Sequence, residues 1–190
     1  MTDPEPRKAP DPRKAYGINE SLGFVPVRVA VLTVSDTRTM DTDTSGLTLE
    51  RRAEEAGHTI AERRIVPDDR AAIRAAVSQW IAADDVDVVI TTGGTGLTGR
   101  DVTVEAVRPL FEKEIDGFSV VFHMVSHGTV GLSTLQGRAC AGLANNTFVF
   151  CLPGSNGAVK DGWDHVIRDQ LDSRHRPCNL VELMPRLSET

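Results

Sequence analysis

Short apolar runs alternate with longer amphipathic segments along most of the chain. The short runs are rich in β-branched residues and bounded by turn residues, which is typical of strands buried in a parallel sheet, whereas the longer segments repeat their apolar positions at helical spacing. The predicted strands are 27–34, 59–66, 86–90 and 147–152. The predicted helices are 46–56, 70–83, 102–110, 117–126 and the segment that follows Ser155. Because strands and helices alternate with short links, the pattern predicts a three-layer α/β/α domain, doubly wound around a mostly parallel sheet.

The chain divides by composition into an arm, a domain and a tail. Residues 1–26 hold five of the ten prolines together with mixed charges, so this segment cannot bury an apolar face of its own. We interpret it as a proline-rich N-terminal arm, which is either a disordered tail or an element that packs on a partner through Tyr16, Leu22 and Phe24. Residues 27–181 are predicted to form the α/β domain, and residues 182–190 a C-terminal tail.

A glycine-rich turn, TTGGTG at 91–96, follows the strand at 86–90. Glycine adopts backbone conformations that other residues avoid, so such a turn can direct several N–H groups at a phosphate, next to the positive end of a helix that starts at 102. No Lys-Ser or Lys-Thr closes the turn, so it is not a P-loop. Gly94, Gly96 and Gly99 have the spacing of a dinucleotide-binding turn, but no second strand with a terminal acidic residue follows. The pattern therefore favours an anion-binding turn of another type.

Acidic residues follow two of the predicted strands. Asp101 is either the N-cap of the next helix or a carboxylate that lies beside a phosphate and ligates Mg²⁺. Of Asp68 and Asp69, one is predicted to cap the helix at 70–83, while the other faces the same edge of the sheet as Asp101. Two convergent carboxylates are typical of metal or proton chemistry, although capping alone also explains an Asp pair before a helix.

Small polar turns follow the other two strands that point to this edge. Ser35 and Asp36 end the first strand, and they form either part of a ligand site or a local turn. Pro153, Gly154 and Ser155 end the strand at 147–152. Because the carboxyl ends of parallel strands share one edge of a sheet, the sequence predicts a single site there. His123 and His127 lack the intervening Glu of a zinc-binding helix, so no zinc site is predicted.

Charge and cysteine content narrow the class of protein. A net charge of −6 gives no electrostatic basis for binding nucleic acid or an anionic membrane. The three cysteines form no C-x-x-C pair, which indicates a reducing compartment and no structural zinc. The sequence has neither a secretory signal nor an apolar run of roughly eighteen residues. We therefore expect a soluble cytoplasmic protein.

An ordered series of motifs resembles the molybdenum cofactor biosynthesis family that includes MoaB, MogA and the gephyrin G domain, and is most similar to MoaB. The series spans residues 27–180, and TTGGTG followed five residues later by Asp is its most specific part. The motifs are VAVLTVSDTR at 29–38, DTSG at 43–46, VPDD at 66–69, TTGGTGLTGRDVT at 91–103, DGF at 116–118, RACAGLANNT at 138–147 and LPGS at 152–155.

This resemblance implies the fold of molybdenum cofactor biosynthesis proteins and adenylylation of molybdopterin. In that reaction the terminal phosphate of the pterin attacks the α-phosphate of ATP, and pyrophosphate leaves with the help of Mg²⁺. By resemblance, Asp68 and Asp101 are the catalytic and metal-orienting acids. The implied substrate-binding residues are Ser35, Asp36, Thr91, Thr92, Gly93, Gly94, Thr95, Gly96, Pro153, Gly154 and Ser155.

Two departures from the family pattern keep alternatives open. Val120 stands where the family's G-F-G-E has a carboxylate, and Gly137 stands where a serine precedes arginine. The alternatives are a non-catalytic molybdopterin-binding paralogue and a molybdate-inserting relative. The resemblance also implies a trimer or hexamer, and a downstream molybdenum-insertion protein as partner.

Overall fold

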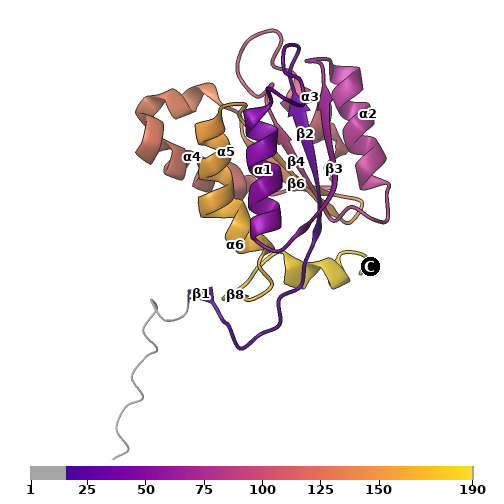
Figure 1. The fold of residues 1–190 in the computed structure, drawn as a ribbon, viewed down its shortest axis with the longest axis vertical. Helices are drawn as coiled ribbons and strands as arrows, with labels where there is room; N and C mark the ends of the chain where they lie inside the picture. The colour runs from indigo at the N-terminus through magenta and orange to yellow at the C-terminus, as the bar shows by residue number, and fades with distance from the viewer. Residues whose placement is uncertain (1–15, 190) are drawn as a thin grey trace, which may run out of the picture.

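The computed structural model describes residues 16–189, which fold around a six-stranded sheet (Figure 1). The strand order across the sheet is β3-β2-β4-β7-β6-β5. The first four strands are parallel, and β6 and β5 run antiparallel to their neighbours. The strand bounds are β2 Arg28–Val34, β3 Thr59–Val66, β4 Val88–Thr92, β5 Lys113–Glu114, β6 Cys140–Ala144 and β7 Thr147–Leu152. The predicted mostly parallel sheet is therefore confirmed.

Helices cover both faces of the sheet and make the predicted three layers (Figure 1). The α-helices are α1 Thr44–Glu55, α2 Arg70–Ile81, α3 Thr103–Val107, α4 Asp116–Val130, α5 Asn156–Gly162 and α6 Arg168–Leu171. Short helical turns are η2 Arg108–Leu110, η3 Gly131–Gln136, η4 Trp163–Ile167 and η5 Val181–Arg186. No helix within residues 16–189 combines the length and apolar character that crossing a membrane requires.

The two apolar cores follow from side-chain alternation along the strands. Val29 and Val31 of β2 face α1, α4 and α5, while Ala30 and Leu32 face α2 and α3. All four side chains are fully buried, as expected for a strand covered on both sides. This explains why the central strands read as continuous apolar runs.

Strands β5 and β6 were not predicted from the sequence. The segment CAGLA of β6 is made of small residues and lacks the β-branched side chains that mark the other strands. A two-residue turn joins β6 to β7 through Asn145 and Asn146, whose φ angles of 44° and 66° suit the type I′ hairpins that Asn favours. The sequence signal for the antiparallel edge of the sheet is thus the Asn-Asn turn, and the residues of β6 themselves carry little strand preference.

The described part of the predicted N-terminal arm packs on its own chain. Strand β1, Gly17–Ile18, pairs antiparallel with β8, His175–Arg176, near the C-terminus (Figure 1). The Phe24 ring lies 5.3 Å from the ring of His58, so this predicted anchor for a partner contacts the domain itself. Residues 1–15 lie outside the described residues, and the boundaries assigned at 26 and 181 stay predictions.

Candidate functional site

Three turns converge at the carboxyl edge of β2, β4 and β7. The Gly93 N–H donates to the Leu152 carbonyl over 3.1 Å, and the Thr92 hydroxyl donates to the Pro153 carbonyl over 3.1 Å. These bonds join the glycine turn to the turn after β7. A cavity of about 310 Å³ lies between the turns. It is lined by Thr33, Val34, Ser35, Arg38, Asp43, Ser45, Thr92, Gly93, Gly94, Asp101 and Gly154.

The glycine turn needs its glycines at two positions. Gly93 and Gly94 have φ angles of +101° and +63°, in the region that side chains disfavour. A Cβ on Gly93 would also clash with the Val34 carbonyl oxygen. Thr103 fixes the turn from the other side, since its hydroxyl donates to the Gly93 carbonyl over 2.8 Å and its N–H to the Gly94 carbonyl over 2.9 Å. The backbone therefore forms the cavity wall in a defined conformation.

One N–H group of the predicted anion-binding turn already has a hydrogen-bond partner within the protein. The Gly93 N–H is bonded to Leu152, so it is not available to a phosphate. Among residues 16–189, no hydrogen bond uses the N–H of Gly94 or Thr95. The Thr95 hydroxyl is also buried without a partner in the described chain. Unsatisfied polar groups at a cavity wall favour a polar ligand there.

Asp101 does not cap the helix that follows it, so that interpretation was wrong. Val102 occupies the N-cap position of α3 without a side-chain hydrogen bond. The Asp101 carboxylate instead accepts hydrogen bonds from the N–H and the hydroxyl of Thr98, over 2.8 and 2.6 Å. Burial acts to raise the pKa of Asp101, but these hydrogen bonds outweigh it and lower the pKa. An ionised carboxylate therefore faces the cavity.

Asp68 and Asp69 divide the two roles predicted for them. Asp69 caps α2 by accepting a hydrogen bond from Ala72 N over 2.8 Å. Asp68 instead faces Asp36, and each carboxylate accepts the backbone N–H of the other residue over 3.1 Å. Asp36 also forms an ion pair with Arg100. The turns after β2 and β3 are thus joined by a pair of carboxylates.

The two carboxylates of this pair differ in pKa. Burial, and then the negative charge of Asp36, raise the pKa of Asp68. The hydrogen bond from Arg100 lowers the pKa of Asp36. Asp101 adds a further negative charge near Asp68. A cation bound at Asp68 would relieve this repulsion.

The donor set fits Mg²⁺ held jointly by protein and substrate. Within residues 16–189, no cluster of three or more metal-binding side chains is present. Mg²⁺ commonly binds through one or two carboxylates together with substrate phosphates, so a complete protein cage is not required. Asp68, beside Gly94, and Asp101, beside Gly96, are the carboxylates that would hold it.

A second cavity, of about 590 Å³, adjoins the first. Asp101 and Gly154 line both cavities. Thr95, Gly96, Pro153 and Ser155 line the second cavity, where polar side chains of α4 and α5 such as Ser126, Thr129 and Lys160 also lie. Two adjoining cavities with a shared carboxylate can hold two substrates side by side.

Some predicted site residues have mainly local contacts. The Ser35 hydroxyl accepts the N–H groups of Thr37 and Arg38 over 3.2 Å each, which is the predicted local turn. Ser155 caps α5 by accepting Ala158 N over 3.1 Å. Thr91 is fully buried in β4 and lines neither cavity.

Arg138 is a site-supporting residue to which the sequence assigned no role. Its Nε donates to the Gly96 carbonyl over 2.7 Å and to the Thr95 carbonyl over 3.2 Å, and Nη2 donates to the Asp101 carbonyl over 2.8 Å. Glu105 pairs with the same guanidinium. Arg138 therefore fixes the glycine turn through its backbone carbonyls. The sequence does not indicate this role, because Arg138 is followed by a run of small residues.

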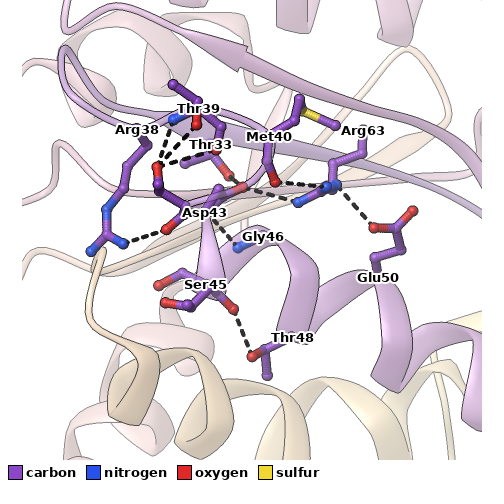
Figure 2. Close-up of polar contacts among 12 residues, drawn as sticks. Thr33, Arg38, Thr39, Met40, Asp43, Ser45, Gly46, Thr48, Glu50 and Arg63 are labelled. Carbon is purple, nitrogen blue, oxygen red and sulfur yellow. Dashed lines mark hydrogen bonds and ion pairs between the residues drawn. The ribbon is translucent and has the colours of Figure 1, made fainter.

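Asp43 and Ser45 of the DTSG motif line the first cavity, and Figure 2 shows the polar contacts around them. Asp43 is buried, caps α1 through Gly46 N over 2.9 Å, and accepts the Thr33 hydroxyl over 2.7 Å. Arg63 approaches the same carboxylate at 3.3 Å. The Ser45 hydroxyl donates to the Gly154 carbonyl over 2.9 Å, which ties α1 to the turn after β7. From the sequence alone this segment is interpreted as a polar turn, because the residues that bond to Asp43 and Ser45 come from distant segments.

Comparison with known proteins defines the class. Residues 30–173 match the family model described as "Probable molybdopterin binding domain". Molybdenum cofactor biosynthesis protein B of Escherichia coli K12 is 53% identical over 159 residues, which cover 84% of this chain and 94% of that protein. The chain therefore belongs to the molybdenum cofactor biosynthesis family, and its role lies in that pathway.

Solved structures agree with this assignment. A crystal structure of a molybdenum cofactor biosynthesis protein B has 44% identity and a TM-score of 0.75, covering 77% of this chain and 92% of that one. The tungsten cofactor synthesizing protein MoaB from Pyrococcus furiosus has 37% identity and a TM-score of 0.67, covering 73% and 89%. The chain is thus similar to members named for either metal.

Proposed function

We propose that this protein adenylylates molybdopterin in a Mg-ATP-dependent reaction that releases pyrophosphate. The observation that carries the proposal is that two carboxylates border the glycine turn, Asp68 beside Gly94 and Asp101 beside Gly96. Asp101 lines both adjoining cavities, whereas Asp68 lines neither and approaches the turn from the side of Asp36. One cavity accommodates the nucleotide and the other the pterin, and Asp101 borders both. The relatives named above motivate the choice of pterin.

In this proposal the chain contributes positioning and electrostatics. The free N–H groups of the glycine turn bind a phosphate, and the Thr95 hydroxyl gains the partner that it lacks in the described chain. Arg138 keeps the turn in place through its carbonyl contacts. Mg²⁺ would stabilise negative charge on the phosphates of ATP. No covalent nucleophile is needed, because holding the pterin phosphate in line with the α-phosphate supplies much of the rate enhancement.

Pyrophosphate release tests the activity. Purified protein should release pyrophosphate from Mg-ATP only after molybdopterin is added. Binding of molybdopterin without pyrophosphate release would reject the enzyme and favour a non-catalytic molybdopterin-binding protein. A molybdate-inserting relative would instead consume adenylylated molybdopterin when molybdate is supplied.

The two departures from the family pattern differ in their distance from the site. Val120 lines neither site cavity and is 59% exposed, so the missing carboxylate does not remove a group from the cavity walls. Gly137 does line the second cavity, and a Cβ there would lie 3.1 Å from Pro153 Cγ. The position of Val120 favours the enzyme, and the position of Gly137 keeps weakened pterin binding as the second candidate.

We further propose that the protein is a trimer or hexamer. Six large apolar side chains are exposed on the consecutive elements α4 and η3, and we call this set the α4 face: Val120, Val121, Met124, Val130, Leu132 and Leu135. An apolar surface of this kind suits contact with a second copy. Light scattering should give a mass near six chains, falling toward three when residues 1–20 are removed; a monomer at micromolar concentration would contradict this. A cytoplasmic location and delivery of the product to a molybdenum-insertion protein stay predictions.

A further inference from the structure

Two of the three cysteines lie opposite each other in the sheet, and neither of them lines a site cavity. Cys140 of β6 pairs in register with Cys151 of β7. Both are buried, whereas Cys178 is exposed. Directly opposed residues of an antiparallel pair point to the same face of the sheet, and both cysteines belong to the core under α2 and α3. The two thiols are therefore neighbours in the interior.

The Cα spacing of the two cysteines falls within the range of a disulfide. The carbonyls of Ala141 and Leu143 accept hydrogen bonds from Ile115 and Glu112 on the β5 side, so the alternate residue Cys140 makes its backbone bonds to β7. Such hydrogen-bonded antiparallel pairs have Cα atoms about 5.5 Å apart. Disulfides bridge Cα separations of about 4.4 to 6.8 Å, so this spacing lies within their range. The Cβ atoms of a hydrogen-bonded pair are about 5.5 Å apart, beyond the roughly 3.5 to 4.5 Å of a disulfide, so closure must bring the two strands about 1 Å closer at this pair.

The two thiols differ in access and in acidity. Cys140 is 5% exposed and lines a cavity of about 850 Å³ together with Arg108 and Arg138, so this cavity is the side from which a small oxidant would approach it. Interaction with the Cys151 thiol lowers the pKa of Cys140 against the effect of burial, and both arginines lower it further. Interaction with Cys140, together with burial, raises the pKa of Cys151. Cys140 is therefore the cysteine that forms the thiolate, and Cys151 is the resolving thiol.

We propose that Cys140 and Cys151 form a peroxide-reactive dithiol that closes to an intrachain disulfide. The Cys140 thiolate attacks hydrogen peroxide, so an S–O bond forms, the O–O bond breaks and hydroxide leaves, giving a sulfenic acid. The Cys151 sulfur then attacks Cys140, so an S–S bond forms, the S–O bond breaks, and the oxygen leaves as water with the Cys151 proton. Overall two thiols are oxidised and one peroxide is reduced to two waters.

The disulfide would join the two strands that support the glycine turn. Arg138, two residues before Cys140, bonds to the turn through Thr95 and Gly96. Leu152, next to Cys151, accepts the Gly93 N–H. Oxidation would therefore add a covalent link between β6 and β7 next to the residues that contact the glycine turn, whatever reaction the site performs.

Peptide mapping of the full chain tests the proposal. Trypsin cleaves after Arg138 and Lys160, so residues 139–160 form one peptide that carries both cysteines, while Cys178 lies in a separate peptide, 175–186. Native protein is treated with hydrogen peroxide, denatured, alkylated and digested. We expect peptide 139–160 to lose about 2 Da and to take up no alkylating reagent, and dithiothreitol to reverse both changes.

Variants provide matched controls. The Cys178→Ser protein should give the same result as the wild type. In Cys151→Ser, dimedone should trap a sulfenic acid on Cys140, with circular dichroism confirming the fold. Full alkylation of Cys140 and Cys151 in peroxide-treated wild-type protein would overturn the proposal, as would disulfides formed only through Cys178. The wild-type map decides the question even if a variant fails to fold.

Discussion

The two acidic residues beside the glycine turn, Asp68 and Asp101, have opposite electrostatic surroundings. Asp101 is bound by the N–H and hydroxyl of Thr98, and these bonds lower its pKa. Asp68 is partly buried beside Asp36, and its pKa is raised. One carboxylate is satisfied by the protein and the other is left in unfavourable electrostatic surroundings. The difference teaches that a bound cation would relieve more electrostatic repulsion at Asp68 than at Asp101. Asp101 instead provides a negative charge that the protein itself stabilises.

The largest expected effect is on turnover. Asp68→Asn and Asp101→Asn should each lower kcat by about 10²- to 10³-fold, because both groups act on charge that develops in the transition state. Molybdopterin binding and KM should change little. Steady-state pyrophosphate release measures both quantities, with Asp69→Asn as the control, since Asp69 only caps α2. Wild-type turnover in Asp68→Asn would assign that residue a purely structural role.

A smaller effect should follow from loosening the support behind the turn. Arg138→Lys keeps the charge but loses the fork that joins the carbonyls of Gly96 and Asp101, so we expect a loss of about 1–3 kcal/mol in stability. We also expect kcat to fall by about tenfold. Urea unfolding and the same assay measure the two effects. The matched control is Arg108→Lys, in an exposed ion pair with Glu114, where stability should stay within about 0.5 kcal/mol. Equal losses in both variants would contradict a specific role for Arg138.

The pH dependence should distinguish the two acids. An ordinary Asp has a pKa of about 3.9. Because the pKa of Asp68 is raised, Asp68 becomes protonated at a higher pH than an ordinary Asp as the pH falls. Activity should therefore decline on the acid side above the range of a free Asp. Removing the neighbouring charge in Asp36→Asn should move this decline to lower pH. A pH profile of kcat/KM that is identical in the two proteins would exclude Asp68 as the titrating group.

The smallest effect concerns stability. Because the pKa of Asp68 is higher in the folded than in the unfolded chain, the folded state binds the proton more tightly. Its contribution to stability is therefore favourable below the unfolded pKa, and it is lost as the pH rises through the folded pKa. At neutral pH, Asp68→Asn should leave the Tm unchanged or slightly higher, whereas Asp101→Asn should lower it. Calorimetry at pH 7 measures both, and a marked loss of Tm in Asp68→Asn would contradict the electrostatic account.

The sequence predicted the central fold because the buried parallel strands carry their own signal. The strands at 59–66 and 147–152 have the predicted bounds, since continuous or widely repeated apolar positions define them. Strand β6 escaped prediction because small residues such as Gly142 carry no strand preference. A Cβ at Gly142 would clash with the Phe111 ring, so packing from a distant segment explains the glycine.

The site was predictable only where a motif lies within one turn. The TTGGTG turn and the acids beside it could be read from local spacing. The capping of α3 could not, because Asp101 is engaged by Thr98 in a turn that local preference does not specify. The contacts of Arg138 and Asp43 depend on segments tens of residues away, which one sequence does not connect.

The most direct measurement follows the phosphorus atoms of ATP. Wild-type protein is incubated with Mg²⁺, molybdopterin and ATP labelled at either the α- or the γ-phosphate. We predict that the α-label appears in adenylylated molybdopterin and the γ-label in pyrophosphate, in equal amounts, and that both transfers disappear when Mg²⁺ is chelated. Retention of the α-label in AMP or ATP, with molybdopterin bound but unmodified, would contradict the proposed reaction.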